Sequence, residues 1–435
     1  MQRRRAFTVE FGLGDEHMKL EIVTETFPPE VNGVAMTLER IASGMLDRGH
    51  DVGIVRPRQG GNDRSGYVEG LRHSVSRGFP IPGYAGLRFG LPSRKRFMRD
   101  WGEYRPDLIH VATEGPLGWS AIQAARTLGI PVVSSYHTKF SSYSDHYNIG
   151  FLRRQIGHYL RFVHNRTQAT LAPSSDSMKE LYNEGYRNLY LLERGVDTKL
   201  FSPMKRDESL RSEWKCKATD TVALYVGRVA KEKNLDLLIE SYKQMKAISP
   251  STRLVVVGDG PERSKLQRVC PEIEFAGTRR GEDLARHYAS ADVFLFSSLT
   301  ETFGNVAIEA MSSGLYVLAY DYAAASRFVQ SGTSGRTVGF GDRMEFLKAA
   351  REIASNRGDW DEIRAAARAS VLGYSWNSIV EQYEQLLDQI VAKRNGVPAP
   401  SKKTRPSLLN PVRGRPKSAP AKTLASVPKG ETLPM

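Results

Sequence analysis

Two glutamates, Glu301 and Glu309, are separated by seven residues in the stretch SLTETFGNVAIEAMSSG, which closely follows the apolar run ADVFLF. A carboxylate repels phosphate but accepts hydrogen bonds from hydroxyl groups. Glu301 precedes a Phe-Gly-Asn turn, and Glu309 is expected on the second turn of the helix that follows. The pair therefore suits hydroxyl groups on either side of an anion, although either glutamate alone could be an ordinary surface charge.

The turn between the two glutamates supplies the place for that anion. Thr302, Phe303 and Gly304 are expected to connect a strand to a helix, with Asn305 as the N-cap. Backbone N–H groups at a helix start have no intrahelical acceptor and bind phosphate readily. A nucleotide diphosphate sugar carries ribose hydroxyls, a diphosphate and hexose hydroxyls in that order, which matches this layout.

Two cations follow an earlier strand, in YVGRVAKEKNLDLL. Arg228 comes just past the strand and Lys233 just before the next helix, where together they would neutralise a diphosphate. For either residue alone, a solvated surface charge is an equally good interpretation.

Two glycine-containing turns also follow strands. VVVGDGPER places Gly258 and Asp259 at a strand end, with Pro261 in the favoured first position of a helix. TETFPPEVNGVAM places Asn32 and Gly33 before a helix, where a missing Cβ lets backbone N–H groups approach an anion. Both stretches could equally be simple turns.

The elements that must position these residues alternate between short apolar strands and helices. Nearly continuous apolar strands separated by helices indicate parallel sheets covered on both faces, so we expect an α/β fold with two doubly wound halves. In such sheets ligands bind beyond the carboxyl ends of the strands. The expected strands are LEIVTE, DVGIVRP, DLIHVA, PVVSSYH and ATLAPS in the first half and TVALYVG, RLVVVGDG, VFLFSS and YVLAY in the second. The expected helices include 37–48, 116–128, 234–246 and 305–313, and the halves should join within 193–220.

Composition limits the class of protein. A chain of 435 residues with 40% hydrophobic residues is long enough for two domains, and its two cysteines, Cys216 and Cys270, have neither disulfide-framework nor zinc-site spacing. No apolar run is long enough to span a bilayer, and the basic start lacks the apolar segment of a signal peptide. These features are typical of a cytoplasmic protein.

The net charge of +14 is concentrated at the end of the chain. From Lys393 onward, ten Lys and Arg residues and eight prolines accompany a single acid, Glu431, so we expect a flexible cationic tail. Such a tail could bind an anionic membrane surface, nucleic acid or nothing specific.

Taken together, NGV, GRVAKEK, VVGDGP and the E-x7-E motif ETFGNVAIE followed by AMSSG resemble the retaining glycosyltransferases of family 4, which have the GT-B architecture. The resemblance runs from about Lys19 to Ile390. It implies two Rossmann-like domains that face each other across a cleft, with the acceptor on the first and the sugar donor mostly on the second. The expected parts are a disordered arm at 1–17, an acceptor domain at 18–195, a nucleotide-sugar domain at 196–375, a helix at 376–392 that packs back on the first domain, and the basic tail at 393–435.

The resemblance also implies roles for individual residues. Arg228 and Lys233 would hold the diphosphate and stabilise the leaving group. Glu309 would accept hydrogen bonds from the ribose hydroxyls, and Glu301 would bind the hydroxyls of the transferred sugar.

Backbone groups at Gly33, Phe303 and Gly304 would complete the phosphate cradle, with Asn32, Gly258, Asp259 and Asn305 also near the donor. His137, in SSYHTKF at a strand end, matches the family histidine near the hexose. A lone histidine is usually structural, so only its position in the resemblance makes it a site residue.

No cofactor or metal is expected. The reaction needs charge stabilisation of the departing diphosphate and orientation of two substrates, which cations and helix starts can supply. The letters DWD at Asp359 to Asp361 match a metal-binding motif, but they lie where a late amphipathic helix should begin, so we interpret them as helix capping.

The identity of the substrates is less defined. FAGTRRGEDLARHYASADVF resembles the GDP-mannose-dependent α-mannosyltransferases that build mannolipids, while UDP-glucose and UDP-galactose stay open as donors. The basic segments LPSRKRFMRDW and GFLRRQIGHYLRFVHNRT, the second with Leu152, Ile156, Tyr159 and Val163 on one face, could lie on the cytoplasmic face of a membrane or be ordinary core helices. A lipid-linked or glycan acceptor is therefore expected.

Other classes fit less well. A nicotinamide dehydrogenase would carry G-x-G-x-x-G after a strand, whereas Gly12 and Gly14 follow no strand and lack the third glycine. Nucleic-acid binding would rest on the tail and overall charge alone. An inactive protein that still binds a nucleotide sugar remains an alternative, although every expected site residue is present.

Overall fold

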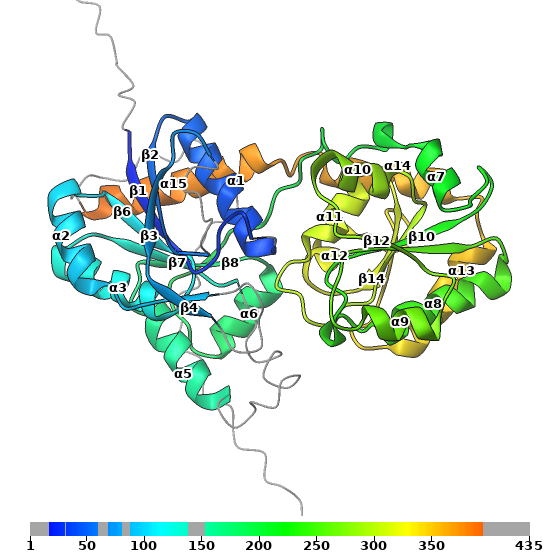
Figure 1. Ribbon diagram of the computed structural model, residues 1–435, viewed down its shortest axis with the longest axis horizontal. Coiled ribbons are helices and arrows are strands. Elements are labelled where there is room, and N and C mark those ends of the chain that lie inside the picture. The colour runs from blue at the N-terminus through cyan, green and yellow to red at the C-terminus, as the bar shows by residue number, and fades with distance from the viewer. Residues whose placement is uncertain (1–16, 31, 60–67, 81–87, 138–152, 395–435) are drawn as a thin grey trace, which may run out of the picture.

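The computed structural model describes residues 17–30, 32–59, 68–80, 88–137 and 153–394. Two separate parallel sheets, each flanked by helices, form the two halves (Figure 1). The α/β doubly wound architecture expected from the sequence is confirmed. Most of the arm expected at 1–17, and the tail beyond Arg394, lie outside the described residues.

The first half is built on a seven-stranded sheet whose paired strands are all parallel. In spatial order its strands are β3 (Arg72–Ser76), β2 (Asp51–Pro57), β1 (Lys19–Val23), β6 (Leu108–Val111), β7 (Val132–Ser135), β8 (Ala169–Ala172) and β9 (Leu189–Leu191). A small antiparallel ribbon, β4 (Gly78–Pro80) with β5 (Arg88–Gly90), lies beside it. Its helices are α1 (Gly33–Asp47), α2 (Arg94–Tyr104), α3 (Pro116–Leu128), α5 (Arg153–His164) and α6 (Ser175–Asn183).

The second half is built on a six-stranded parallel sheet. In spatial order its strands are β12 (Glu274–Gly277), β11 (Arg253–Val257), β10 (Val222–Val226), β13 (Val293–Phe296), β14 (Tyr316–Tyr320) and β15 (Arg336–Val338). Its helices are α7 (Glu208–Glu213), α8 (Leu235–Ile248), α9 (Arg263–Val269), α10 (Gly281–Ala289), α11 (Asn305–Ser312), α12 (Ala323–Phe328), α13 (Arg343–Ser355) and α14 (Trp360–Val371), with short 3-10 turns η2 (Pro203–Lys205) and η3 (Lys231–Lys233).

The central strands β10, β13 and β14 of the second sheet are apolar throughout because both of their faces are covered. Along β10, Val222 and Leu224 belong to the core on one face of the second sheet, while Ala223 and Tyr225 belong to the core on the other. All five residues of β10 are buried. The sequence pattern located such strands correctly for this reason. It missed the edge strands of both sheets, β3, β9, β12 and β15, and the ribbon strands β4 and β5, which are short, polar or only partly buried.

The strand order predicts where each sheet would bind a ligand, at the carboxyl ends of two central strands. In the first sheet the order reverses between β1 and β6, and in the second it reverses between β10 and β13. Ligands bind beyond the carboxyl ends of strands at such a reversal, because the two loops that follow diverge to opposite faces of the sheet. The loops after β10 and β13 are those that carry Arg228, Lys233 and Glu301.

The last helix, α15 (Trp376–Arg394), returns to the first half and lies beside α1 (Figure 1). The chain crosses between the halves where Val196 pairs with Ser375 in an isolated parallel bridge. Six apolar residues of α15 are buried in the core that β1 and α1 also form: Ile379, Val380, Tyr383, Leu386, Leu387 and Ile390. The Tyr383 hydroxyl also forms a hydrogen bond with His110 Nδ1 on β6, at 2.8 Å.

One local prediction about a helix start was wrong. Pro261 does not begin a helix; α9 starts two residues later, because a turn in which Arg263 N–H bonds to the Gly260 carbonyl comes first. On α5 the buried residues are Leu160, Val163 and His164, and Tyr159, which helical spacing placed on the same face as Val163, is 40% exposed. Leu152 lies outside the described residues.

We predict that Leu387→Ala lowers the free energy of unfolding by about 2–5 kcal/mol, because it leaves a cavity between α15 and the first sheet. Denaturant unfolding followed by circular dichroism measures the change. Glu381→Ala, an exposed position on the same helix, is the control and should change stability by less than about 0.5 kcal/mol. Equal, small effects of both substitutions would show that α15 does not stabilise the first half.

Candidate active site

Lys233 and Glu301 join the loops that follow β10 and β13. The Lys233 ammonium lies 2.5 Å from Glu301 Oε1, and each side chain is only 17% exposed. Two further bonds hold the loops together: the Ser297 hydroxyl donates to the Lys233 carbonyl and the Thr300 hydroxyl to the Glu232 carbonyl. Burial favours the neutral form of Glu301, but the Lys233 ammonium outweighs it and holds the pKa of Glu301 below its ordinary value. The pair is therefore ionic at neutral pH.

Arg228 lies on the same loop as Lys233, just beyond β10. Its guanidinium is 41% exposed and donates to the buried carboxylate of Glu232 at 3.3 Å. The Tyr225 hydroxyl donates to the Arg228 carbonyl and fixes the backbone. Two cations thus follow the same strand at the point where the order of the second sheet reverses.

The start of α11 is open to a ligand. Gly304, at φ 86°, is the N-cap residue, and no side chain caps this helix. Asn305 was predicted as the N-cap, and this was wrong: it is the first helical residue. Gly304 suits the position because its backbone is left-handed and an added Cβ would lie 3.0 Å from the Phe296 ring. The N–H groups of Asn305 and Val306 therefore have neither an intrahelical acceptor nor a capping side chain, while Ala307 N–H bonds to the Gly304 carbonyl.

Phe303 contributes to this turn through its backbone alone. Its side chain is 3% exposed and packs edge-on against Phe328, with ring centroids 6.3 Å apart. Its carbonyl accepts a hydrogen bond from Ala324 N–H. The buried ring anchors the turn, so that the backbone before α11 stays in place.

Glu309 lies one turn further along α11 and accepts a hydrogen bond from the Tyr288 hydroxyl at 2.9 Å. Burial raises the pKa of Glu309 to about 7, although the Tyr288 hydroxyl and the positive charge of Arg40 oppose the shift. Arg40 lies on α1 of the first half and also forms an ion pair with Asp197 at 3.3 Å. The first half therefore contributes a cation to the electrostatics of Glu309.

His137 brings the first half to the same place. It follows β7, and its backbone carbonyl accepts a hydrogen bond from the Thr302 hydroxyl at 3.1 Å, next to Glu301. Its imidazole is buried, and burial followed by the charge of Arg194 holds the pKa of His137 well below its ordinary value. The ring is neutral at physiological pH.

Asn32 and Gly33 start α1 in the structure. The Asn32 side-chain oxygen accepts from the N–H groups of Val34 and Ala35, so the residue caps the helix. Its amide nitrogen donates to the Thr26 hydroxyl at 2.7 Å. An added Cβ at Gly33 would meet no atom within 4 Å, so packing does not require glycine there. The cap occupies the side-chain groups that were expected near the donor.

Gly258 and Asp259 have local partners. An added Cβ at Gly258 would lie 2.0 Å from the Gly227 carbonyl oxygen, so glycine lets the loops after β10 and β11 lie against each other. The Asp259 carboxylate accepts from Gly260 N–H and pairs with Arg263 at 3.4 Å. These contacts shape the loop that carries Arg228, and none of them joins Asp259 to the Lys233–Glu301 pair.

The structure gives no metal cluster within its described ranges: there, no three His, Cys, Asp or Glu residues group closely enough to hold an ion. The capping interpretation of DWD needs correction, because the Asp359 side chain makes no capping bond to α14 and instead accepts from the Asn356 amide at 2.9 Å. Asp361 does lie in the first turn, as expected.

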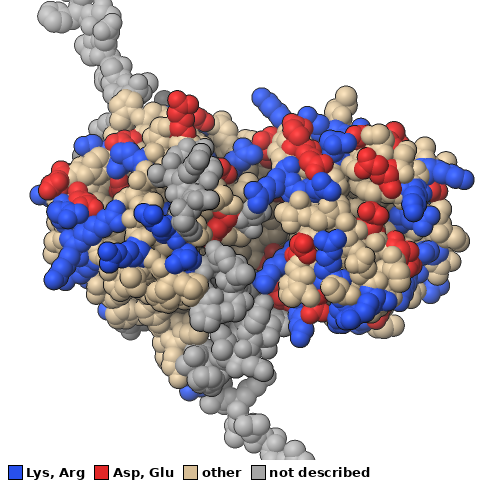
Figure 2. Space-filling view, in the orientation of Figure 1, with Lys and Arg blue, Asp and Glu red and all other residues tan. Residues whose placement is uncertain are grey.

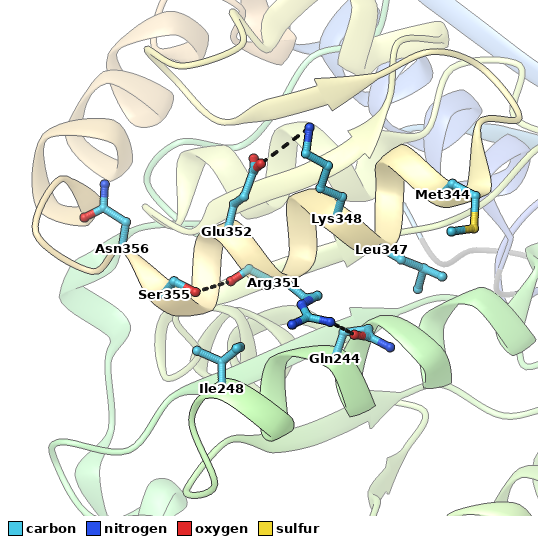
Figure 3. Close-up of a pocket in the computed structure, with 9 residues that line it drawn as sticks. All are labelled: Gln244, Ile248, Met344, Leu347, Lys348, Arg351, Glu352, Ser355 and Asn356. Atoms are coloured by element: carbon cyan, nitrogen blue, oxygen red, sulfur yellow. Dashed lines mark hydrogen bonds and ion pairs between the residues drawn. The ribbon is translucent and has the colours of Figure 1, made fainter.

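A separate hollow of about 840 Å³ lies between α8 and α13 on the second half (Figure 3). Arg351 reaches across it to the Gln244 side chain at 3.2 Å, while Lys348 lies near Glu352 along α13. None of the residues expected from the sequence to bind the donor lines this hollow.

Sequence reasoning missed four residues of the site. Tyr288 and Arg40 act on Glu309, Arg194 bonds to His137, and the Tyr322 hydroxyl donates to the Glu301 carbonyl. Arg194 had a usable signal, because it follows the last strand of the first half in ERGVD. The other three lie on helices or loops whose approach to the site depends on the tertiary fold.

Two family models match this chain: Glycosyltransferase Family 4 at residues 31–200 and Glycosyl transferases group 1 at residues 220–356. The chain is 35% identical to a GDP-mannose-dependent alpha-mannosyltransferase of Mycobacterium tuberculosis over 84% of this chain and 95% of that protein. It is 30% identical to the sulfoquinovosyl transferase SQD2 of Arabidopsis thaliana over 80% of this chain and 69% of that protein.

Solved structures share the fold. A sucrose-phosphate synthase from Thermosynechococcus elongatus matches with a TM-score of 0.73 at 19% identity, over 87% of this chain and all of that one. HepE from Anabaena, in complex with UDP and glucose, matches with a TM-score of 0.66 at 20% identity, over 86% of this chain and all of that one.

The fold and site therefore define a GT-B enzyme that uses a nucleotide sugar. The chain belongs to glycosyltransferase family 4 and is a hexosyltransferase. The resemblance inferred from the sequence motifs is confirmed.

The pKa of Glu309 leads to a prediction about stability. The folded chain keeps the Glu309 proton up to about pH 7, whereas the unfolded chain loses it near the ordinary value of 4.5, so the free energy of unfolding falls as pH rises between these values. Glu309→Gln stays neutral and keeps an acceptor for Tyr288. Relative to the native protein, it should gain about 1–2 kcal/mol in the free energy of unfolding between about pH 5 and about pH 8, allowing for solvent screening.

Denaturant unfolding at the two pH values measures this difference. Glu381→Gln, at an exposed position, is the control, and its stability should follow that of the native protein at both pH values. A Glu309→Gln curve parallel to the native one would show that Glu309 is already ionised in the folded protein at the lower pH.

Proposed function

We propose that the protein transfers an α-mannosyl group from GDP-mannose, with retention and without a metal, to a lipid-linked acceptor. The observation that carries this proposal is the Lys233–Glu301 pair just before the uncapped start of α11, with Arg228 on the same loop as Lys233 and Glu309 one turn along the helix. This arrangement offers positive charge for a diphosphate and acceptors for hydroxyl groups at both ends of the donor.

The diphosphate would bind at the start of α11. Its charge would be shared by the helix N–H groups, the Arg228 guanidinium and the Lys233 ammonium. Glu301 holds Lys233 in place at 2.5 Å and keeps a second carboxylate oxygen for hexose hydroxyls. Glu309, held by Tyr288, would accept from the ribose hydroxyls.

These groups would favour departure of the nucleoside diphosphate. As the bond to the sugar breaks, negative charge builds up on the leaving phosphate, and donors already fixed around it stabilise that charge. The Lys233–Glu301 pair and the buried Phe303 ring hold these hydrogen-bonding groups in position before the nucleotide sugar binds. Little reorganisation of the protein is therefore needed.

The donor assignment rests on relatives. The Mycobacterium tuberculosis protein, at 35% identity along nearly its whole length, is named a GDP-mannose-dependent alpha-mannosyltransferase. We take the same donor for this chain and keep UDP-glucose and UDP-galactose as the alternatives to be tested.

We predict that GDP-mannose binds more tightly than either UDP-hexose, and that Arg228→Ala weakens its binding by about 10–100-fold because one charged contact to the diphosphate is lost. Isothermal titration calorimetry with all three donors measures both effects. Mass spectrometry of products formed with membrane extract would then identify the acceptor.

Arg343→Ala is the matched control, because Arg343 is also about half exposed and paired with a glutamate, Glu240, but lies on α13. Its donor affinity should be unchanged. Tighter binding of a UDP-hexose would overturn the donor assignment, and equal effects of the two arginine variants would overturn the role of Arg228.

The acceptor proposal rests on a basic face of the first half. Figure 2 shows Lys and Arg gathered on the side where α2 and α3 lie. On α2, Phe97 and Trp101 are buried while Arg94, Lys95 and Arg99 are exposed, and Phe79 and Leu91 nearby in the chain are 45% and 40% exposed. Basic side chains beside exposed apolar ones suit the surface of an anionic membrane. No described helix is long and apolar enough to cross a bilayer.

We predict that the protein co-sediments with anionic vesicles and that the triple variant Arg94→Gln, Lys95→Gln, Arg99→Gln weakens this binding by about tenfold or more, because each basic residue near the surface contributes about 1 kcal/mol. The triple variant Arg343→Gln, Lys348→Gln, Arg351→Gln on α13 removes the same charge from the other half and serves as control. Equal loss of vesicle binding in both triple variants would show that binding depends on the net charge of the protein and not on the basic face of α2.

A further inference from the structure

Arg194 and His137 form a buried pair at the edge of the site. An Arg194 guanidinium nitrogen lies 2.8 Å from His137 Nδ1, and the two residues are 7% and 8% exposed. Arg194 follows β9 and directly precedes the stretch in which the chain crosses to the second half, where Val196 pairs with Ser375. The pair therefore lies between the point where the chain crosses to the second half and the hydrogen bond from the Thr302 hydroxyl to the His137 carbonyl.

The direction of this hydrogen bond follows from its chemistry. A guanidinium has donors only, so Arg194 must donate and His137 Nδ1 must accept. A neutral imidazole carries one proton, so that proton is on Nε2. Burial lowers the pKa of Arg194 only to about 10, so the guanidinium is charged and donating throughout the physiological range.

The other ring nitrogen is left with an unused donor. His137 Nε2 is buried and has no hydrogen-bond partner among the residues that the structure describes. A buried N–H without an acceptor is costly, so one held in this form is expected to have an acceptor in the complex with a ligand. A hydroxyl of the transferred sugar, close to Glu301, would supply one.

We propose that Arg194 is a positioning residue that fixes His137 as the Nε2–H tautomer, so that the imidazole acts in sugar transfer as a neutral hydrogen-bond donor rather than as an acid. This inference rests on the proposed function only for the identity of the acceptor hydroxyl. The tautomer itself is a property of the protein without any substrate.

The surroundings of His137 support a neutral ring. Burial and the charge of Arg194 are the main causes that lower the pKa of His137, and His110 on β6 and His164 on α5 act in the same direction. His110 forms hydrogen bonds with the hydroxyls of Tyr383 on α15 and Ser135, while His164 contacts Ser134 and Glu114. None of these groups offers His137 a carboxylate, so protonation stays unfavourable.

Nitrogen NMR of the protein with isotope-labelled histidine tests the proposal. The nine histidines give separate signals, and the His137 signals are those lost in His137→Phe. We expect one protonated and one unprotonated nitrogen at His137, assigned to Nε2 and Nδ1, with no titration between about pH 5 and pH 8. If His137 of the native protein shows a mixture of tautomers, or titrates near the ordinary pKa of histidine, the proposal is overturned without the need for any variant.

Variants at Arg194 extend the test to activity. In Arg194→Met, His137 should no longer be held as one tautomer, its pKa should rise, and kcat should fall by about tenfold or more and become dependent on pH. Arg194→Lys keeps a charged donor, so it should partly restore the native tautomer, pKa and kcat. Arg187→Met, an exposed arginine of the same half, is the control and should leave the NMR signals and kcat unchanged.

The outcomes separate the inference from the proposed function. A fixed Nε2–H tautomer that is lost in Arg194→Met supports the inference even if the preferred donor is a UDP-hexose. If Arg194→Met folds, as its circular dichroism shows, and keeps the native tautomer, Arg194 does not set it. If Arg194→Met does not fold, the tautomer of His137 in the native protein and in Arg194→Lys still tests whether Arg194 sets it.

Discussion

The site depends on the ion pair between Lys233 and Glu301. It joins the loops that follow β10 and β13, the two strands between which the order of the second sheet reverses. A largely buried ion pair stabilises a protein little, because desolvation offsets the attraction between the charges. Its value here is geometric: it holds a cation and a carboxylate at a fixed separation next to the open start of α11. The Ser297 and Thr300 hydroxyls, which donate to the backbone carbonyls of Lys233 and Glu232, hold the same two loops together.

The first half reaches this arrangement through a few contacts. His137 bonds to Thr302 through its backbone, and Arg40 acts on Glu309 from α1. Asp176, at the start of α6, accepts from Ala323 N–H on α12. These polar contacts leave the two sheets with separate apolar cores. A small change in the angle between the halves would therefore alter the environment of His137 and Glu309 before it disturbed either core.

The sequence predicted the central strands and the turn before α11 because both obey strong local rules. A strand covered on both faces is largely apolar, as VALYV is, and a glycine with positive φ leaves few alternatives at Gly304. Motif spacing then located Arg228, Lys233 and Glu301 after strands and Glu309 on the helix that follows.

The errors have equally local causes. Asn305 and Asp359 are good capping residues by type, but the backbone put Gly304 at one cap and turned the Asp359 carboxylate toward Asn356. Helical spacing placed Tyr159 on one face with Val163, but it is 40% exposed and its hydroxyl reaches the Glu114 carbonyl. Arg194, Tyr288 and Arg40 act through partners far away in the chain, which single-sequence patterns do not encode.

The return of α15 to the first half has a consequence for how the molecule is made. A ribosome completes the strands from β1 to β9 long before residues 376–394 emerge, yet the core around Leu20 and Ile22 includes Tyr383 and Leu387. Domains usually fold in order of synthesis. Here the half that is translated first can finish its core only after the whole second sheet has been synthesised, whereas the second half, with all its strands between Val222 and Val338, has no such delay.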